Sequence, residues 1–534
     1  MSESLNKSVH ARALRPVAVV DVGTTSIRMA IAEIGEQGYV RLLESLSQGV
    51  SLGNDTFSTG EISRRTIEDC VAVLWAYRQK LAEYKIDVAH DVRVVATSAV
   101  REAANRLAFV DRAFVGTGFD VEPIEEAEVH RITYRSIQPL LKAQPDLFRS
   151  PSLIVEVGGG STEILVLERD NVVFSHSYRL GSLRMQQSLQ SLRVSKAKIR
   201  DIMETEIRSQ MEVISEQLPR DRPMNMVAMG GDVRFALREL LPEAVNDELS
   251  RIPVSMLAEF VEKLSAMRLE GIVQEYRLTF PEAQTLVPAL LISLRLAEML
   301  GQDHIIVSQA NLRDGLLLDM AEEGRWTEDF RKQIVRAAWE LARKYHVDED
   351  HARAVADLSK LLFRSLQGEH QLDDRYETVL YVAALLHEIG GFVNTSSIHK
   401  HSMYLVVHSD LFGLTPDDLL LVALITRYHR RALPKPTHQP YNTLDRDRRI
   451  IVSKLAAILR LAIALDASRS QRISRLECNR VRNRLVISVP HVDDLSVEQL
   501  ALQSGRVFFE SIFGLRVLLR PQHRPSITQP STQL

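Results

Sequence analysis

Cysteine is scarce in this sequence: Cys70 and Cys478 are the only two among 534 residues. Two cysteines are too few for a disulfide framework or for a zinc site built from several thiolates. Such scarcity is typical of a protein that works in a reducing compartment, so we expect a cytoplasmic location.

Long apolar runs and a secretory leader are also missing. The first 15 residues include Lys7, Arg12 and Arg15 but no apolar core, and we expect residues 1–15 to form a disordered leader. Even the apolar stretch 286–300 is interrupted by Arg295 and Glu298, and a membrane span needs roughly 18 apolar residues. We therefore expect no integral membrane segment.

Net charge is small as well, because 66 Lys and Arg residues face 69 Asp and Glu residues, which gives −3. The distribution is uneven, since residues 427–484 contain 15 Lys and Arg but only four acids. That segment carries +11, which leaves −14 on the rest of the chain. A basic segment on an acidic chain indicates a polyanionic partner. The segment has no repeat of stacking aromatic residues, so we do not expect a nucleic acid.

Two segments share one pattern: an apolar run that ends in an acid, a glycine, small polar residues and a second apolar run. The first covers residues 16–34 with Asp21 and Gly23, and the second covers 153–167 with Glu156 and Gly158, 135 positions later. Each predicts a buried strand, a turn and a returning strand. The repetition indicates two similar α/β halves that face one another.

The remaining periodicity predicts the domain organisation. Helical spacing is seen at 66–81, 101–115 and 233–241, and then at 330–345, 351–366, 377–387, 417–429 and 450–465, with strand alternation returning at 476–489 and 507–519. We therefore predict an α/β fold with domains at 16–138 and 139–322, an all-α domain at 323–471 and a small α/β unit at 472–534.

The two glycine turns are the segments that predict phosphate binding. A strand that ends in a carboxylate and runs into glycine and small hydroxyl residues exposes backbone N–H groups that can cradle phosphate oxygens. The carboxylate can hold Mg²⁺ directly or through water. Two such turns across a cleft suit a substrate with phosphoanhydride bonds, whereas one alone is more often only a hairpin turn.

The two motifs, residues 20–26 and 155–163, resemble the phosphate motifs of the exopolyphosphatase/guanosine pentaphosphate phosphohydrolase (Ppx/GppA) family. Further segments resemble that family in the same order, at 95–103, 180–184, 308–315, 385–390 and 398–404. The resemblance covers about residues 16–520. It implies two domains with the fold of actin, sugar kinases and chaperone ATPases, followed by an HD-like helical domain.

This resemblance implies a phosphoanhydride hydrolase that depends on Mg²⁺ or Mn²⁺. Metal binding would belong to Asp21, Glu156 and Glu163, and Arg101 would neutralise charge on the transferred phosphoryl group. The other phosphate-binding positions are the small residues of the two turns: Gly23, Thr24, Thr25, Ser26, Gly158, Gly159, Gly160 and Ser161.

The chain departs from the family pattern at several positions. Thr25 replaces Asn, Glu156 replaces Asp, and Ser51 replaces Arg. The family's general base is a glutamate in a Glu-Glu-Ala-Arg stretch. An ungapped count from Arg101 puts Glu128 beside Val129 there, so we predict Glu128 as the base, with Glu126 second if the register shifts. Alternatively, Glu125, Glu126 and Glu128 could be solvent-exposed acids in the first turn of a helix, where the helix dipole favours negative charge.

Two features of the helical domain remain. His351, His387, His399, His401 and His429 invite a metal interpretation, but Ile463 stands where related metal phosphohydrolase domains have aspartate. We therefore expect these histidines to be structural. We predict that Arg427, Arg430, Arg431 and Lys435 bind a polyanion, with a solvated basic surface as the alternative.

Three functions stay open on sequence alone, and a kinase, which the fold would permit, is the weakest fourth alternative. The first is an exopolyphosphatase that removes terminal orthophosphate from inorganic polyphosphate, and the second is a guanosine pentaphosphate phosphohydrolase. The third, of another class, is a regulatory protein that binds a phosphate ligand with little turnover, because of the departures at Glu156, Val129 and Ser51. The resemblance further implies a homodimer.

Overall fold

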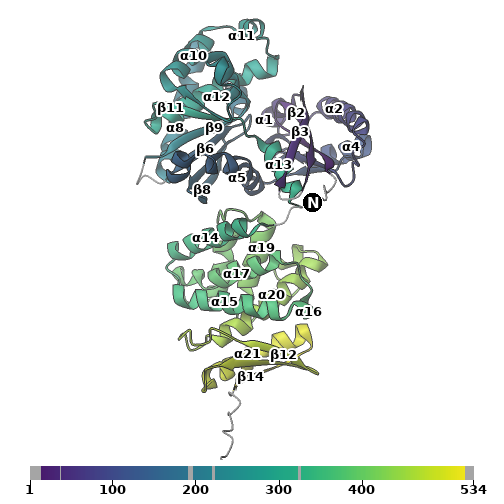
Figure 1. Cartoon of the computed structure of the whole chain (residues 1–534), viewed down its shortest axis with the longest axis vertical. Coiled ribbons are helices and arrows are strands. Elements are labelled where there is room, and N and C mark those ends of the chain that lie inside the picture. The colour runs from purple at the N-terminus through teal and green to yellow at the C-terminus, as the bar shows by residue number, and fades with distance from the viewer. Residues whose placement is uncertain (1–13, 36–37, 191–195, 219–222, 323–325, 523–534) are drawn as a thin grey trace, which may run out of the picture. The chain divides into compact units, whose positions relative to one another are not determined.

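The computed structural model describes residues 14–35, 38–190, 196–218, 223–322 and 326–522 (Figure 1). The chain forms two compact units that divide between residues 325 and 326. Residues 1–13, which belong to the predicted leader, lie outside the described residues. No helix in the described ranges is both long enough and apolar enough to cross a membrane.

The first unit begins with a five-stranded sheet in the order β3-β2-β1-β4-β5. Strands β1 and β2 form an antiparallel hairpin and β3 extends it, while β4 and β5 continue the sheet in parallel with β1. The strand bounds are Arg15–Val22 for β1, Ser26–Ile34 for β2, Val40–Gly49 for β3, Val92–Ala96 for β4 and Val121–Pro123 for β5.

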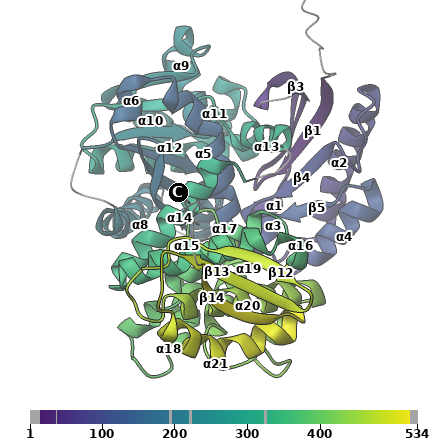
Figure 2. The same cartoon turned by 60° about the horizontal axis from the view of Figure 1, so that its bottom comes forward.

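Both faces of this sheet are covered, which is why β1 is apolar on both sides. Ala18, Val20 and Val22 pack into one core with helices α2 (Arg64–Glu83) and α4 (Arg106–Thr117). Val17 and Val19 pack into the opposite core with α5 (Glu126–Lys142) and α13 (Leu312–Ala321) (Figure 2). The short helices α1 (Leu52–Thr59), α3 (Ser98–Arg101) and α6 (Pro145–Arg149) lie in the connections.

The second sheet repeats the first. Its order is β10-β11-β9-β6-β7-β8, in which β6 and β7 form the antiparallel hairpin and β9 pairs in parallel with β6. The strands are β6 Ser152–Val157, β7 Thr162–Glu168, β8 Asn171–Tyr178, β9 Asn225–Met229, β10 Leu249–Pro253 and β11 His304–Ser308. The predicted pair of similar α/β halves is therefore present, and β10 is an added edge strand.

Helices of this second half bury a large apolar core around α12. Their bounds are α7 Ser182–Gln190, α8 Lys196–Gln217, α9 Gly231–Leu240, α10 Val254–Ala266, α11 Leu269–Tyr276 and α12 Phe280–Met299. The Thr279–Glu282 capping box fixes the start of α12, because each partner satisfies a backbone N–H that the helix leaves unpaired.

The second unit is a helical bundle followed by a small sheet with one helix. The bundle contains α14 Glu328–Lys344, α15 Glu349–Ser365, α16 Gln367–His370, α17 Arg375–Leu386, α18 Ile398–Val407, α19 Pro416–Arg427 and α20 Arg446–Leu465. Strands β12 (Glu477–Val481), β13 (Arg484–Pro490) and β14 (Arg516–Gln522) then form one sheet with α21 (Ser496–Phe513) beside them. All five predicted long helices are present within a few residues of their predicted bounds.

Two element predictions were wrong. Residues 507–513 belong to the helix α21 and not to a strand. Leu502 and Phe509 are buried about two helical turns apart, while Val507 is exposed. The predicted helix 101–115 is interrupted, since α3 ends at Arg101 and α4 starts at Arg106. Helix α18, which carries His399 and His401, was not predicted.

Candidate active site

The two glycine turns have the same hydrogen bond. The N–H of Gly23 donates to the carbonyl of Ser26 at 3.0 Å, and the N–H of Gly158 donates to the carbonyl of Ser161 at 2.8 Å. A Cβ at either glycine would lie 3.1–3.2 Å from that carbonyl oxygen, so glycine keeps both turns tight. Gly23 and Gly158 therefore shape the turns, and their N–H groups already have partners.

The turns face each other closely. A Cβ at Gly159 would lie 2.6 Å from Cγ2 of Thr24, so only glycine lets the second turn approach the first. Gly160 packs against Phe57 and Ser98 in the same way. Behind the second turn, the N–H groups of Ser182 and Leu183 donate to the carbonyls of Gly158 and Gly159. The loop before α7 thus holds the second turn in place.

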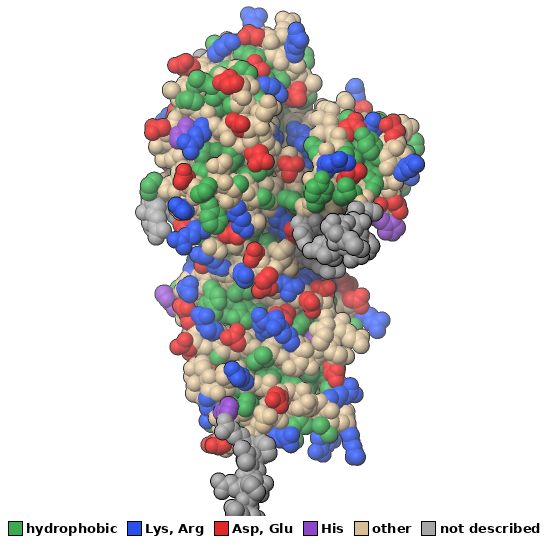
Figure 3. Space-filling view, in the orientation of Figure 1, with side chains coloured by type: hydrophobic (Ala, Val, Ile, Leu, Met, Phe, Trp, Pro, Cys, Tyr) green, Lys and Arg blue, Asp and Glu red, His purple; other side chains and the backbone are tan. Residues whose placement is uncertain are grey.

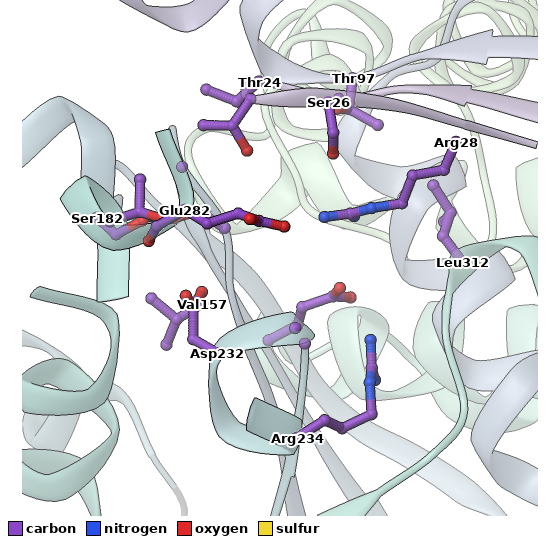
Figure 4. A pocket seen from close by; sticks show the side chains of 18 of the residues that line it. Thr24, Ser26, Arg28, Thr97, Val157, Ser182, Asp232, Arg234, Glu282 and Leu312 are labelled. Carbon is purple, nitrogen blue, oxygen red and sulfur yellow. The ribbon is translucent and has the colours of Figure 1, made fainter. Parts of the chain in front are cut away.

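A cavity of about 470 Å³ lies between the turns (Figure 4). Its wall includes nearly all the predicted phosphate-binding and metal-binding residues. Those that line it are Asp21, Gly23, Thr24, Thr25, Ser26, Arg101, Glu156, Gly158, Gly159, Ser161 and Glu163. The predicted residues absent from this wall are Gly160, Glu126 and Glu128.

Carboxylates lie at the base of the cavity. Burial raises the pKa of Asp21, although Arg28 and Arg313 oppose the shift. Partial burial also raises the pKa of Glu156, with Arg234 opposing and the negative charge of Asp21 adding to it. Both carboxylates thus lack full compensation for lost hydration, and a nearby cation would supply it.

Glu163 is held differently. Burial would raise the pKa of this carboxyl, but hydrogen bonds from His130, Ser177 and Ser161 outweigh burial and lower the pKa. The His130 Nε2 lies 2.8 Å from Oε2 of Glu163, and the Ser161 hydroxyl donates to Oε1 at 2.7 Å. Glu163 is therefore a fixed, ionised group at the wall.

Four arginines line the cavity, namely Arg28, Arg101, Arg234 and Arg238, and only Arg101 among them was predicted. Arg28 of β2 and Arg234 of α9 extend into it from different walls, with Glu282 pointing toward Arg28 (Figure 4). Burial lowers the pKa of Arg234, and repulsion from Arg28 and Arg313 adds to the shift. Arg313 Nη1 lies 3.7 Å from Oδ2 of Asp21. Gly230 and Gly231, which follow an apolar run and precede Asp232, are a sequence signal that could have located Arg234.

The residues fit a hard divalent cation. The donor set of Asp21, Glu156 and Glu163 consists of carboxylate oxygens, which suit Mg²⁺ or Mn²⁺. The buried hydroxyl of Ser26, on the same wall, has no hydrogen-bond partner among the described residues. A bound phosphate oxygen or hydrated ion would satisfy it.

The structure separates the candidate general bases. Glu128 accepts hydrogen bonds from Arg131 at 2.7 and 2.8 Å and pairs with Arg93 at 3.2 Å, in a cluster completed by Asp319. This cluster turns Glu128 away from the cavity, whose wall at this helix is formed by Val129. Glu128, the residue first predicted as the general base, therefore does not line the cavity.

Glu126 lies closer to the site. It pairs with Arg101, whose Nη2 is 3.4 Å from Oε1 of Glu126, and Arg101 lines the cavity. Residues 126 and 129 share one face of α5, because three residues make almost one helical turn. Burial raises the pKa of the Glu126 carboxyl, with repulsion from Glu163 adding to the shift against the attraction of Arg101.

The predicted polyanion-binding residues lie at the end of α19 and in the segment after it. Arg430, Arg431 and Lys435 are exposed, Arg427 is half-buried, and none of the four forms an ion pair within the described ranges. Other cations of the basic segment are used internally; Arg460, for example, donates to the carbonyl of Tyr428. Acidic and basic side chains are interspersed over the helical bundle on the face in Figure 3.

Comparisons with known proteins find relatives over most of the chain. The profile of the Ppx/GppA phosphatase family matches residues 30–323, and the profile of Ppx/GppA phosphatase domain III matches residues 334–503. A guanosine-5'-triphosphate,3'-diphosphate pyrophosphatase of Photobacterium profundum is 26% identical over 486 residues, which are 89% of this chain and 91% of that protein.

Solved structures share the fold of the first unit. An exopolyphosphatase from Cytophaga hutchinsonii superposes with a TM-score of 0.51 at 20% identity, covering 58% of this chain and 98% of that one. An exopolyphosphatase-like protein gives a TM-score of 0.52 at 21% identity, over 58% and 99%. These likenesses concern the fold, which is the predicted pair of actin-like α/β domains.

Proposed function

Because the chain belongs to the Ppx/GppA phosphatase family, we propose that it removes terminal orthophosphate from inorganic polyphosphate. The predicted family and enzyme class, a phosphoanhydride hydrolase, are confirmed by that membership. One observation carries the proposal: two glycine turns face each other across a cavity lined by carboxylates and arginines.

The residues around the terminal phosphoryl group have separate tasks. Thr24, Thr25 and Ser26 would donate hydrogen bonds to the phosphoryl oxygens from one side, and the backbone N–H groups of Gly159 and Ser161 would donate to them from the other. Arg101 stabilises the negative charge that grows on the phosphoryl oxygens as the bond to the leaving phosphate breaks. The protein around the cavity has a lower dielectric constant than water, which strengthens these interactions.

Asp21, Glu156 and Glu163 would hold Mg²⁺ or Mn²⁺. Such an ion neutralises phosphate charge and orients the substrate. Glu156 lines the cavity, and Glu163 is fixed by His130 and Ser161. Burial raises the pKa of Asp21, and a cation at this position would oppose that shift.

We propose Glu126, in place of Glu128, as the general base. Water attacks the terminal phosphorus, its proton passes to the Glu126 carboxylate, and the phosphoanhydride bond breaks to release orthophosphate. The contact of Glu126 with Arg101, which lines the cavity, supports this role. Partial burial raises the pKa of Glu126, which makes its carboxylate a stronger base. Val129 offers no group that can accept the proton.

Hydrolysis of guanosine pentaphosphate is the second candidate. The relative from Photobacterium profundum carries the name of that activity. Asp232, Glu282 and Phe235 extend the cavity wall beyond the two turns. Carboxylates accept hydrogen bonds from the N–H groups of guanine, and an aromatic ring can stack on its face.

One experiment separates the candidates. Orthophosphate release is measured with Mg²⁺ from long-chain polyphosphate and, in parallel, from guanosine pentaphosphate. We expect faster release from polyphosphate, and at least about 100-fold loss in Asp21→Asn. Faster release from guanosine pentaphosphate would favour the second candidate. Binding of either compound without release would favour a regulatory protein, and full activity of Asp21→Asn would contradict the site.

A further inference from the structure

A second cavity of the structure lies within the helical unit and has a volume of about 510 Å³. Its walls come from three helices, because α14 and α15 each pack against α17 and leave a groove between them (Figure 1). The lining positions of α14 recur every three or four residues from 328 to 343, so one whole face of that helix borders the groove. A volume between roughly 300 and 1,000 Å³ is typical of sites for small molecules.

Two aromatic side chains line this groove, Trp339 of α14 and Tyr381 of α17. Both are half-buried, so part of each side chain still faces the cavity. The hydroxyl of Tyr381 donates to Oδ1 of Asp357 at 3.1 Å. The guanidinium carbon of Arg353, on α15, lies 4.8 Å from the ring centre of Trp339, and that of Arg343 lies 5.8 Å from it. An aromatic ring and a guanidinium plane are both surfaces on which a nucleobase stacks.

Basic side chains border the groove on both of its long walls. One wall, α14, contributes four of them and the other wall, α15, contributes two. They are Arg331, Lys332, Arg336 and Arg343 on α14 and Arg353 and Lys360 on α15. Cations that face one another across a groove can hold a phosphate group from two sides through charge-assisted hydrogen bonds.

The two cations of α15 have binding capacity to spare. Arg353 forms no ion pair within the part of the chain that the structure describes. Lys360 lies 3.7 Å from a carboxylate oxygen of Glu377, but that carboxylate already accepts hydrogen bonds from Arg364 at 2.6 and 2.9 Å. Arg364 is therefore the main partner of Glu377, and Arg353 and Lys360 are available to an anion in the groove.

The groove also contains four carboxylates, and these decide between two kinds of anion. They belong to Glu328, Glu340, Asp357 and Glu377. An inorganic phosphate chain would be attracted by the cations but repelled by the carboxylates, and it has no group that stacks on an aromatic ring. A nucleotide uses all three kinds of side chain, because its phosphates bind cations, its base stacks, and its N–H and hydroxyl groups donate to carboxylates.

We propose that the groove between α14 and α15 binds a nucleoside diphosphate or triphosphate. Its base lies against Trp339 and Arg353, which are already in contact. Lys360 is on the same face of α15 as Arg353, seven residues and thus about 10 Å further along the helix. A base at Trp339 therefore directs its phosphates along α15 toward Lys360. All residues of this site belong to the helical unit, and none lines the cavity of the first unit.

The test is nucleotide binding by the full chain, measured by titration calorimetry in EDTA. GDP and UDP, a purine and a pyrimidine nucleotide, are titrated separately. Excess inorganic tripolyphosphate is present to fill the phosphate-binding cavity of the first unit. We expect at least one of the two nucleotides to bind at one site per chain, because tripolyphosphate has no base with which to occupy the groove. Binding of neither nucleotide, or binding that tripolyphosphate abolishes, overturns the proposal.

Variants locate the bound nucleotide. We expect Trp339→Leu to weaken binding at least about tenfold, whereas Trp339→Phe keeps a ring for stacking and should bind within a few-fold of the wild type. Arg353→Gln/Lys360→Gln should weaken binding at least about tenfold. Arg64→Gln/Arg65→Gln, at exposed positions of α2, removes the same charge and should bind as the wild type does. Equal affinity of the wild type and Arg353→Gln/Lys360→Gln overturns the proposal, and this surface variant covers the case in which Trp339→Leu does not fold.

Discussion

At the scale of single residues, the direction in which a glutamate points from helix α5 determines whether it is near the cavity or in a stabilising ion-pair cluster. Glu126 and Glu128 are two residues apart on α5, yet Glu126 contacts Arg101 of the cavity while Glu128 is held by Arg93 and Arg131. Residues two apart on a helix point in different directions. The pair therefore offers a matched test of the proposed base.

We expect Glu126→Gln to lower the rate of phosphate release by about 100-fold or more, because the amide cannot accept the proton of the attacking water. Glu128→Gln should retain a rate within a few-fold of the wild type. It should instead lower the free energy of unfolding by about 1–3 kcal/mol, since Arg93, Arg131 and Asp319 lose part of a largely buried ion-pair cluster. Steady-state kinetics and urea unfolding measure both effects; the reverse pattern would restore Glu128 as the base.

Asp232 predicts a pH dependence of stability. Burial raises the pKa of this carboxyl from 3.8 to about 6, although Arg28 and Arg234 oppose the shift. A group whose pKa is raised by folding stabilises the protein at low pH, and that contribution is lost as the pH rises through about 6.

In EDTA, the wild type should therefore lose about 1 kcal/mol more stability between pH 5 and pH 8 than Asp232→Asn does. Asparagine removes the titration and keeps the shape of the side chain. Urea unfolding at the two pH values gives the difference. Parallel stability profiles for the two proteins would mean that Asp232 ionises as freely in the folded chain as in the unfolded one.

At the scale of elements, close backbone approach explains the glycines of the site. Gly181 precedes α7, and a Cβ there would lie 2.3 Å from the carbonyl carbon of Gly160 and 2.4 Å from the carbonyl oxygen of Gly159. These are backbone atoms of the second phosphate turn, and they cannot move aside without moving the turn. The loop before α7 and the turn therefore form one rigid element.

Gly181→Ala should displace the second turn, lower phosphate release at least about tenfold, and lower the free energy of unfolding by about 1–3 kcal/mol. Gly271→Ala in α11 is the matched control. Its Cβ would meet only the flexible end of Met267 at 3.8 Å, and alanine favours a helix over glycine. Activity assays and thermal unfolding of both variants test the prediction, which equal activity of Gly181→Ala and the wild type would contradict.

At the scale of the whole molecule, the net charge of −3 hides a basic segment whose cations have different uses. Arg448, Arg469 and Arg472 pair with acids of the helical unit. The exposed Arg430, Arg431 and Lys435 have no such pairs among the described residues. These residues, with Arg427, remain our proposed contact for a polyanion.

Charge reversal in Arg430→Glu/Arg431→Glu should raise KM for long polyphosphate by about tenfold and flatten its dependence on salt. The effect should vanish for a substrate too short to reach beyond the cavity. Arg64→Glu/Arg65→Glu, at exposed positions of α2, makes the same change in net charge. An equal rise of KM in both double variants would assign the effect to net charge.

We also propose that the chain forms a homodimer, which a measurement of the molecular mass in solution would test.

Much of the fold could be predicted from the sequence, because hydrophobic period and turn residues are local signals. The repeated strand, acid and glycine predicted both hairpins, and 3.6-residue spacing predicted the long bundle helices. The apolar run at 507–513 was misassigned, since a short apolar run fits a strand as well as a helix. The interruption after Arg101 has a similar cause, because apolar spacing continues across it.

The sequence by itself determined the residue types of the cavity and the family, since these depend on adjacent residues in two short motifs. Only the tertiary structure decided which distant residues join them. Arg28 and Arg234 enter the cavity from separate elements, Glu128 is turned away by Arg93, and Asp466 orients His351 across 115 positions of sequence. Such long-range contacts arise from the packing of whole helices and sheets. A local sequence pattern therefore cannot predict them.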